Sequence, residues 1–219
     1  MKIRPFLFLP FAVLAASCAT GKAGDNNPVA EANDPVIEAA LASNAEFGRT
    51  RFIEKGLQPI EEAARDGREV RRILVRAWVP GDLPALELEK LPDGSVTLAL
   101  ARGGAVEKRV PVPAGTWARF AALDAGVYAP PPPRAPVSES ARSASCHGTG
   151  ALFESASGGV VRSASADQCV NASSPFNEAR RETMNTLVDL ALAAQPGCER
   201  KLDESMEWLL SRCFGAPHG

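Results

Sequence analysis

Between residues 70 and 112 the sequence alternates apolar and polar side chains and is interrupted by short turn signals. The alternation covers four stretches, 70–79, 86–89, 96–100 and 106–112. A period of two residues is typical of a β-strand that buries one face. Pro92-Asp93-Gly94 and Gly103-Gly104 are tight-turn sequences, so consecutive strands should pair as an antiparallel meander with one buried face. This meander restricts the chain to folds built on an antiparallel sheet.

A β-hairpin is expected further along the chain. The segments 149–155 and 160–166 flank Gly158-Gly159, and two strands joined by such a dipeptide form a hairpin. A proline-rich segment, residues 129–136, precedes them. Proline has no backbone N–H to donate to a sheet, so we expect this segment to be a stiff spacer rather than a strand.

Helices are predicted before and after these strands. Apolar residues at helical spacing cover five segments, 34–47, 59–66, 116–123, 174–194 and 199–213. Gly48 should end the first, and the last two should pack against the sheet as an antiparallel helical hairpin. The predicted fold class is therefore α+β. We expect an antiparallel β-meander and a β-hairpin packed with a disulfide-linked C-terminal helical hairpin, in a single domain over residues 34–216.

The N-terminus has the pattern of an export signal. Lys2 and Arg4 form a positive n-region, and the apolar stretch 5–16 that follows is too short to span a bilayer. We therefore expect a signal peptide over residues 1–17. The polar, Gly- and Asn-containing stretch after it is typical of a flexible tether, which we assign to residues 18–33.

The end of this signal, Leu14-Ala15-Ala16-Ser17-Cys18, resembles the bacterial lipobox, in which a cysteine is lipidated and becomes the first residue of the mature protein. Ala15 stands where that motif usually has leucine. The resemblance implies lipid attachment at Cys18, and Ala19 after it implies the periplasmic side of the outer membrane. The alternative is plain secretion without Cys18, as a soluble periplasmic or secreted protein. Both interpretations export the chain.

Four further cysteines are disulfide candidates, because an even count in an exported chain favours two bonds: Cys146, Cys169, Cys198 and Cys213. Cys198 and Cys213 would lie about 22 Å apart on one predicted helix, whereas a disulfide needs Cα atoms within about 7 Å. The helical hairpin therefore favours Cys169–Cys213 together with Cys146–Cys198. However, Cys146 and Cys169 should face each other across the predicted β-hairpin, which argues against that pairing.

A local excess of positive charge precedes and enters the first strand, in Arg65, Arg68, Arg71, Arg72 and Arg76. Arg72 and Arg76 share a strand face with Trp78. Glu87 and Glu89 lie on the next strand and can pair with these arginines across the sheet, and this ion-paired face is the interpretation we favour. The alternative is a binding face of Arg72, Arg76 and Trp78 for a lipid headgroup, a glycan or an acidic partner.

Few residues could carry catalysis. Two histidines and one tyrosine leave little material for a metal site or for acid–base chemistry near neutral pH. Cys146-His147 has the composition of a nucleophile–base pair, but neighbouring strand residues point to opposite faces, and export favours oxidation of Cys146. The chain also lacks a Gly-x-Ser-x-Gly elbow and a phosphate-binding loop. We expect no catalytic residue, no metal and no cofactor.

The charge balance excludes nucleic acid as the expected partner. The formal net charge is −2, and removing Lys2 and Arg4 with the signal peptide would make it −4. We expect a non-enzymatic binding or structural module of the cell envelope, held at the membrane by its lipid. Its partner would be an unidentified envelope component or protein. The alternative is a secreted or periplasmic hydrolase with a site assembled around His147.

Overall fold

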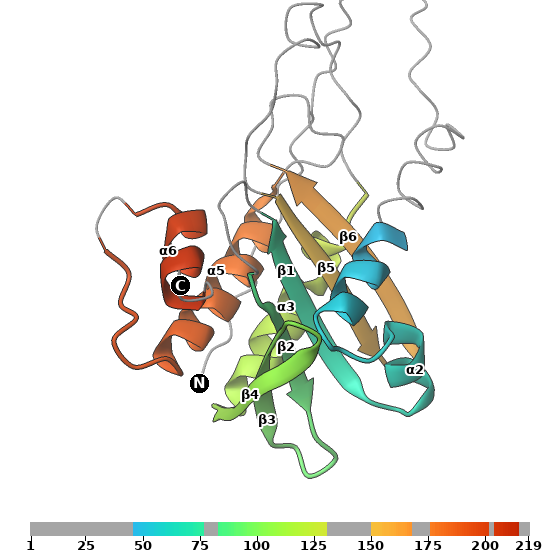
Figure 1. Cartoon of the computed structure of the whole chain (residues 1–219). Coiled ribbons are helices and arrows are strands. Elements are labelled where there is room, and N and C mark those ends of the chain that lie inside the picture. The colour runs from blue at the N-terminus through green and yellow to red at the C-terminus, as the bar shows by residue number, and fades with distance from the viewer. Residues whose placement is uncertain (1–45, 77–82, 131–149, 168–175, 202–203, 215–219) are drawn as a thin grey trace, which may run out of the picture. The chain divides into compact units, whose positions relative to one another are not determined.

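A computed structural model describes residues 46–76, 83–130, 150–167, 176–201 and 204–214. Its centre is an antiparallel sheet of six strands in the order β4-β3-β2-β1-β5-β6 (Figure 1). The strands are β1 (Glu69–Arg76), β2 (Ala85–Lys90), β3 (Val96–Arg102), β4 (Ala105–Val112), β5 (Gly150–Ser157) and β6 (Val160–Asp167). The predicted α+β fold is confirmed, because the meander forms β1 to β4 and the hairpin forms β5 and β6.

The hairpin joins the meander at its first strand. β5 runs antiparallel to β1, so that Ile73 faces Phe153 on one side and Leu86 of β2 on the other. β1 is therefore an interior strand with a hydrogen-bonded neighbour on each side. This pairing places side chains about 80 residues apart in the sequence next to each other.

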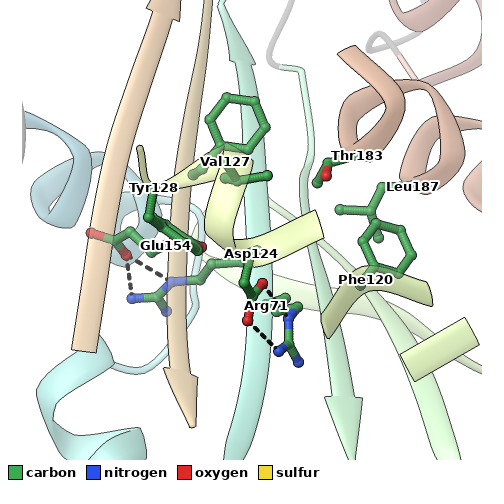
Figure 2. Close-up of a pocket in the computed structure, with 10 residues that line it drawn as sticks. Arg71, Phe120, Asp124, Val127, Tyr128, Glu154, Thr183 and Leu187 are labelled. Carbon is green, nitrogen blue, oxygen red and sulfur yellow. Dashed lines mark hydrogen bonds and ion pairs between the residues drawn. The ribbon is translucent and has the colours of Figure 1, made fainter. Parts of the chain in front are cut away.

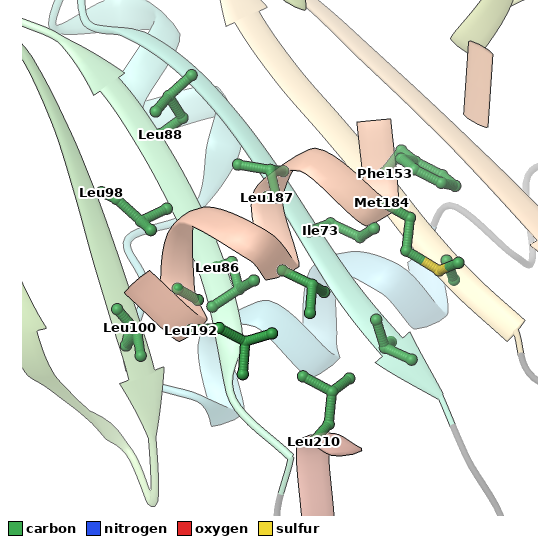
Figure 3. Close-up of a cluster of buried hydrophobic side chains, with 14 of the residues drawn as sticks. Ile73, Leu86, Leu88, Leu98, Leu100, Phe153, Met184, Leu187, Leu192 and Leu210 are labelled. Carbon is green, nitrogen blue, oxygen red and sulfur yellow. The ribbon is translucent and has the colours of Figure 1, made fainter. Parts of the chain in front are cut away.

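The larger apolar core lies between the sheet and the helices α3 (Gly115–Val127), α5 (Glu178–Ala193) and α6 (Met206–Phe214). Figure 3 shows leucines of β2 and β3 facing Met184, Leu187 and Leu192 of α5. α5 begins where the side chain of Asn177 accepts a hydrogen bond from the backbone N–H of Arg180 at 2.8 Å. The predicted helices 116–123 and 174–194 therefore form where described, the first extending to Val127.

Helices also cover the second face of the sheet, although the alternation predicted one buried face. A helix over residues 46–54 and α2 (Ile60–Arg65) pack there (Figure 1). Phe52 and Ile60 are fully buried against two small apolar clusters that include Leu74, Leu152 and Val70. The prediction was incomplete because the charged residues on this face suggested exposure to water, whereas they are paired within the fold.

Gly48 was predicted to end a helix, but it lies inside the helix 46–54. Residues 34–45 are outside the described ranges. A Cβ atom at Gly48 would make ordinary contact, at 3.8 Å, with the side chain of Leu152. The glycine that matters follows the helix. Gly56 has φ 97°, and a Cβ there would lie 2.3 Å from the backbone nitrogen of Ala105. The close approach of this turn to the β3–β4 turn therefore requires glycine.

The C-terminal helix is shorter than predicted, and this changes the disulfide. α6 begins only at Met206. Gly197, with φ 79°, lies in the turn after α5, and residues 198–201, 204 and 205 are not helical. Arg212 fastens this segment by pairing with Glu204 at 2.7 Å and donating to the carbonyl of Glu199 at 2.8 Å.

Cys198 thereby reaches Cys213, at a Cα separation of 5.6 Å, and the two form a disulfide. The predicted pairings Cys169–Cys213 and Cys146–Cys198 are therefore wrong, because they assumed an unbroken helix. Cys146 and Cys169 themselves lie outside the described residues. None of the described helices is both long enough and apolar enough to cross a membrane.

Candidate functional site

The basic cluster found in the sequence is divided between the surface and the two faces of the sheet. Arg65 is exposed, Arg71 lies on the face covered by α3, and Arg72 lies on the face covered by α2. Arg72 is directly opposite Glu87 on β2 and opposite Glu154 on β5. Its guanidinium lies 2.7 Å from Glu154 and 3.7 Å from Glu87, and only 2% of the residue is exposed. The ring of Phe52 covers it at 4.7 Å. The predicted ion pairing of Arg72 with Glu87 is thus confirmed.

Two further arginines extend this arrangement toward the surface. Arg68 donates to Glu89 at 2.7 Å and to Glu87 at 3.2 Å, and Arg109 of β4 donates to Glu89 at 2.6 Å. Together these residues form what we call the charged layer: Arg68, Arg72, Arg109, Glu87, Glu89 and Glu154. Its three positive and three negative side chains balance.

The two ends of the charged layer differ in electrostatics. Burial disfavours the charged form of Glu89, but its hydrogen bond to Arg68 and the charges of Arg68 and Arg109 outweigh this and lower its pKa. At Glu154 burial prevails over the opposing effect of Arg72, so the pKa of this carboxyl is raised. The inner end is therefore the less water-like environment.

The residues of the alternative binding face are not gathered at one exposed surface. Arg72 is buried, so an external ligand cannot reach it. Arg76 is one-third exposed and pairs with Asp167 at 2.7 Å, not with Glu87 or Glu89. Trp78 lies outside the described residues. The sequence did not indicate the roles of Glu154 and Asp167, because both depend on pairing between β1 and the distant hairpin.

A second arginine of β1 lies on the opposite face of the sheet. Arg71 donates two hydrogen bonds to Asp124 of α3, at 3.0 and 2.6 Å (Figure 2). Its guanidinium also stacks on the ring of Trp117 at 4.0 Å. The cavity beside it has a volume of about 10 Å³ and is lined also by Tyr128 and Thr183. That volume holds about one water molecule, so this site anchors α3 and cannot admit a ligand of any size.

A much larger cavity lies beside the disulfide, between the β3–β4 pair and the C-terminal segment. Its volume is about 390 Å³, within the range of small-molecule sites. We call it the basic cavity, and its lining is Arg102, Glu107, Lys108, Gln195, Pro84, Leu100, Cys213 and Phe214. Its lining combines polar side chains, two of them cations, with apolar ones, and Leu100 lies directly across from Lys108 in the β3–β4 pair.

The two cations of the basic cavity have different partners. Arg102 donates to Glu107 at 2.9 and 3.0 Å and also to the backbone carbonyl of Phe214. Lys108 donates to the carbonyl of Ala194, just after α5. Within the described part of the chain, Lys108 forms no ion pair. The sequence did not indicate this cavity, because an unbroken helix through Glu199 would not leave Cys213 and Phe214 facing β4.

The remaining residues named from the sequence lie outside the described ranges: Cys18, Cys146, His147 and Cys169. Among the residues that the structure describes, no group of His, Cys, Asp and Glu side chains could hold a metal ion. The chain matches no protein family, no curated protein and no solved structure.

Proposed function

We propose that this chain is an exported bacterial envelope protein, tethered through lipidated Cys18, and that its folded part is a non-enzymatic binding module. The basic n-region, the short apolar stretch and the LAASC sequence support export and lipid attachment. The expected location is the periplasmic side of the outer membrane. The tether would hold the folded part close to the membrane, where it meets an envelope component or protein partner.

The observation that supports the binding role is a difference between two groups of charged side chains among the described residues: those of the charged layer form ion pairs, whereas Lys108 in the basic cavity does not. The carboxylates of the charged layer are held by arginines at 2.6–3.2 Å inside the fold, an arrangement that serves strand alignment. The basic cavity, by contrast, is open and sizeable, and its Lys108 has no ion pair among the described residues. These properties suit ligand binding rather than catalysis.

Cell fractionation tests the tether. In the producing bacterium the wild-type chain should sediment with the outer membrane, and Cys18→Ser should shift it to the soluble periplasmic fraction, because no acyl chain can be attached. Ala15→Leu is the matched control: it restores the residue usual in a lipobox and should leave the chain at the membrane. Mass spectrometry of the mature N-terminus should find Cys18 with added acyl mass.

Two results would contradict the proposal. One is a wild-type chain in the soluble fraction with its N-terminus beyond Cys18. The other is a Cys18→Ser chain that stays with the membrane as fully as the wild type, since the tether would then lie elsewhere.

A further inference from the structure

We propose that the basic cavity binds a small carboxylate with an apolar body, the chemistry of a medium-chain fatty acid. This inference rests on the proposed binding role and names the ligand class. It uses residues to which the sequence assigned no function. The site would be formed by Lys108 on β4, by Leu100 on β3 and by Phe214 at the end of α6.

Charge defines one half of the ligand. Glu107 already neutralises Arg102, and the carbonyl of Phe214 accepts a further hydrogen bond from that guanidinium. Lys108 has three N–H donors, of which the carbonyl of Ala194 accepts one. Among the described residues, the cavity is therefore left with one half-buried positive charge that no carboxylate balances. A single carboxylate would balance it and accept the remaining donors.

The apolar side chains of the lining define the other half of the ligand. Leu100 lies directly across from Lys108 in the β3–β4 pair, and Phe214 and Pro84 line the same cavity. A purely ionic ligand would make no use of these side chains, and a purely apolar one would cover the ammonium of Lys108 without a partner. Only a molecule with both parts contacts the ammonium and the apolar side chains together. The volume of about 390 Å³ accommodates a short chain rather than a macromolecule.

The disulfide holds part of the cavity lining in place. Cys213 lines the cavity, and its bond to Cys198 joins α6 to the turn after α5, which carries Gln195, another lining residue. A wall fixed before the ligand arrives lowers the conformational entropy lost on binding. The site should therefore be formed in the free, oxidised protein.

The test is isothermal titration of the mature chain, purified from producing cells with its disulfides intact, with three probes. Octanoate has the charge and the apolar body, acetate has only the charge, and 1-octanol has only the body. We expect octanoate to bind at least about tenfold more tightly than either of the others, because it alone contacts both the ammonium of Lys108 and the apolar side chains of the lining. This comparison uses the wild-type chain and does not depend on any variant folding.

Substitution then locates the site. Lys108→Gln should weaken octanoate binding at least about tenfold, and Lys108→Arg, which keeps the charge, should weaken it less. Lys90→Gln removes the same charge from an exposed lysine outside the cavity lining and should leave octanoate affinity unchanged. Circular dichroism confirms that each variant is folded before titration.

The inference is overturned if 1-octanol binds as tightly as octanoate, if octanoate does not bind the folded wild-type chain, or if folded Lys108→Gln binds it as well as wild type does. These outcomes can be told apart from failure of the proposed function. Failed octanoate binding with intact Cys18-dependent membrane localisation removes only the ligand class. Loss of the tether with intact octanoate binding removes only the envelope anchoring.

Discussion

Arg72 shows how a single residue can specify the alignment of three strands. Its guanidinium is positioned between carboxylates at the same level of β2 and β5. A slip of β1 by one residue would turn Arg72 to the opposite, apolar face of the sheet and leave both glutamates without it. Burying these charges is costly, so their contribution lies less in net stability than in excluding wrong registers.

Arg72→Met should therefore be strongly destabilising. We expect the free energy of unfolding to fall by about 3–5 kcal/mol, because Glu87 and Glu154 would lose the charge that compensates their burial. Chemical denaturation followed by circular dichroism measures this. Adding Glu154→Gln to Arg72→Met should recover part of the loss, since one uncompensated carboxylate is then removed.

The matched control is Arg76→Met on the same strand. Arg76 and Asp167 are each about one-third exposed, so this pair should contribute at most about 1 kcal/mol. Equal losses for the two variants would mean that the buried position of Arg72 has no special weight.

At the scale of elements, the C-terminal segment is the part that local sequence patterns describe least well. α5 ends before the turn at Pro196 and Gly197, but residues 198–201, 204 and 205 are not helical, and α6 begins only at Met206. The interaction of Arg212 with Glu204 and the Cys198–Cys213 bond are contacts that a helical periodicity cannot reveal. They hold an element of only nine residues against the sheet.

Reduction of this bond should loosen α6 specifically. Replacing Cys198 and Cys213 by serine should lower the free energy of unfolding by about 3 kcal/mol, the value for a loop of 15 residues. Trypsin digestion without reduction should yield the peptide ending at Arg200 linked to the one beginning at Cys213. Recovery of these cysteines linked instead to Cys146 or Cys169 would contradict the pairing.

The strands and the longer helices could be predicted because each carries its own pattern. Alternation marked β1 to β4, Gly158-Gly159 marked the turn between β5 and β6, and the stripe of Met184 and Leu187 marked α5. The sites could not be predicted in the same way. Glu154 meets Arg72 across 82 positions of sequence, and Lys108 meets the carbonyl of Ala194 across 86. Such long-range contacts depend on how the strands and helices are arranged in space, and local sequence patterns do not reveal that arrangement.

For the molecule as a whole, β1 is the most enclosed strand, because it pairs on both edges and is covered on both faces. It has neighbours on both edges, and residues on both of its faces are buried, whereas β4 is an edge strand with mostly exposed or half-buried residues. Opening β1 requires separating the two groups of helices from the sheet. Opening the outer edge of β4 does not.

Native-state hydrogen exchange should show this difference. Amides of β1 that bond to β2 and β5 should exchange only by global unfolding, and those at the outer edge of β4 should exchange by local fluctuation with a lower opening free energy. The measurement is exchange at several low denaturant concentrations, read by mass spectrometry or NMR. Equal protection of β1 and β4 would contradict the central position of β1.

The pairing of β1 with β5 also has a consequence for the order of folding. The meander closes through short turns, but its first strand must wait for a segment about 80 residues later, and closing so long a loop costs entropy before any contact repays it. We expect the chain to pass through a stage in which β1 to β4 are formed and one edge of β1 is open. At that stage Arg72 has Glu87 but not Glu154, and the open edge can pair with a neighbouring chain. The chain would therefore be most prone to aggregation after β4 has paired and before β5 has joined the sheet.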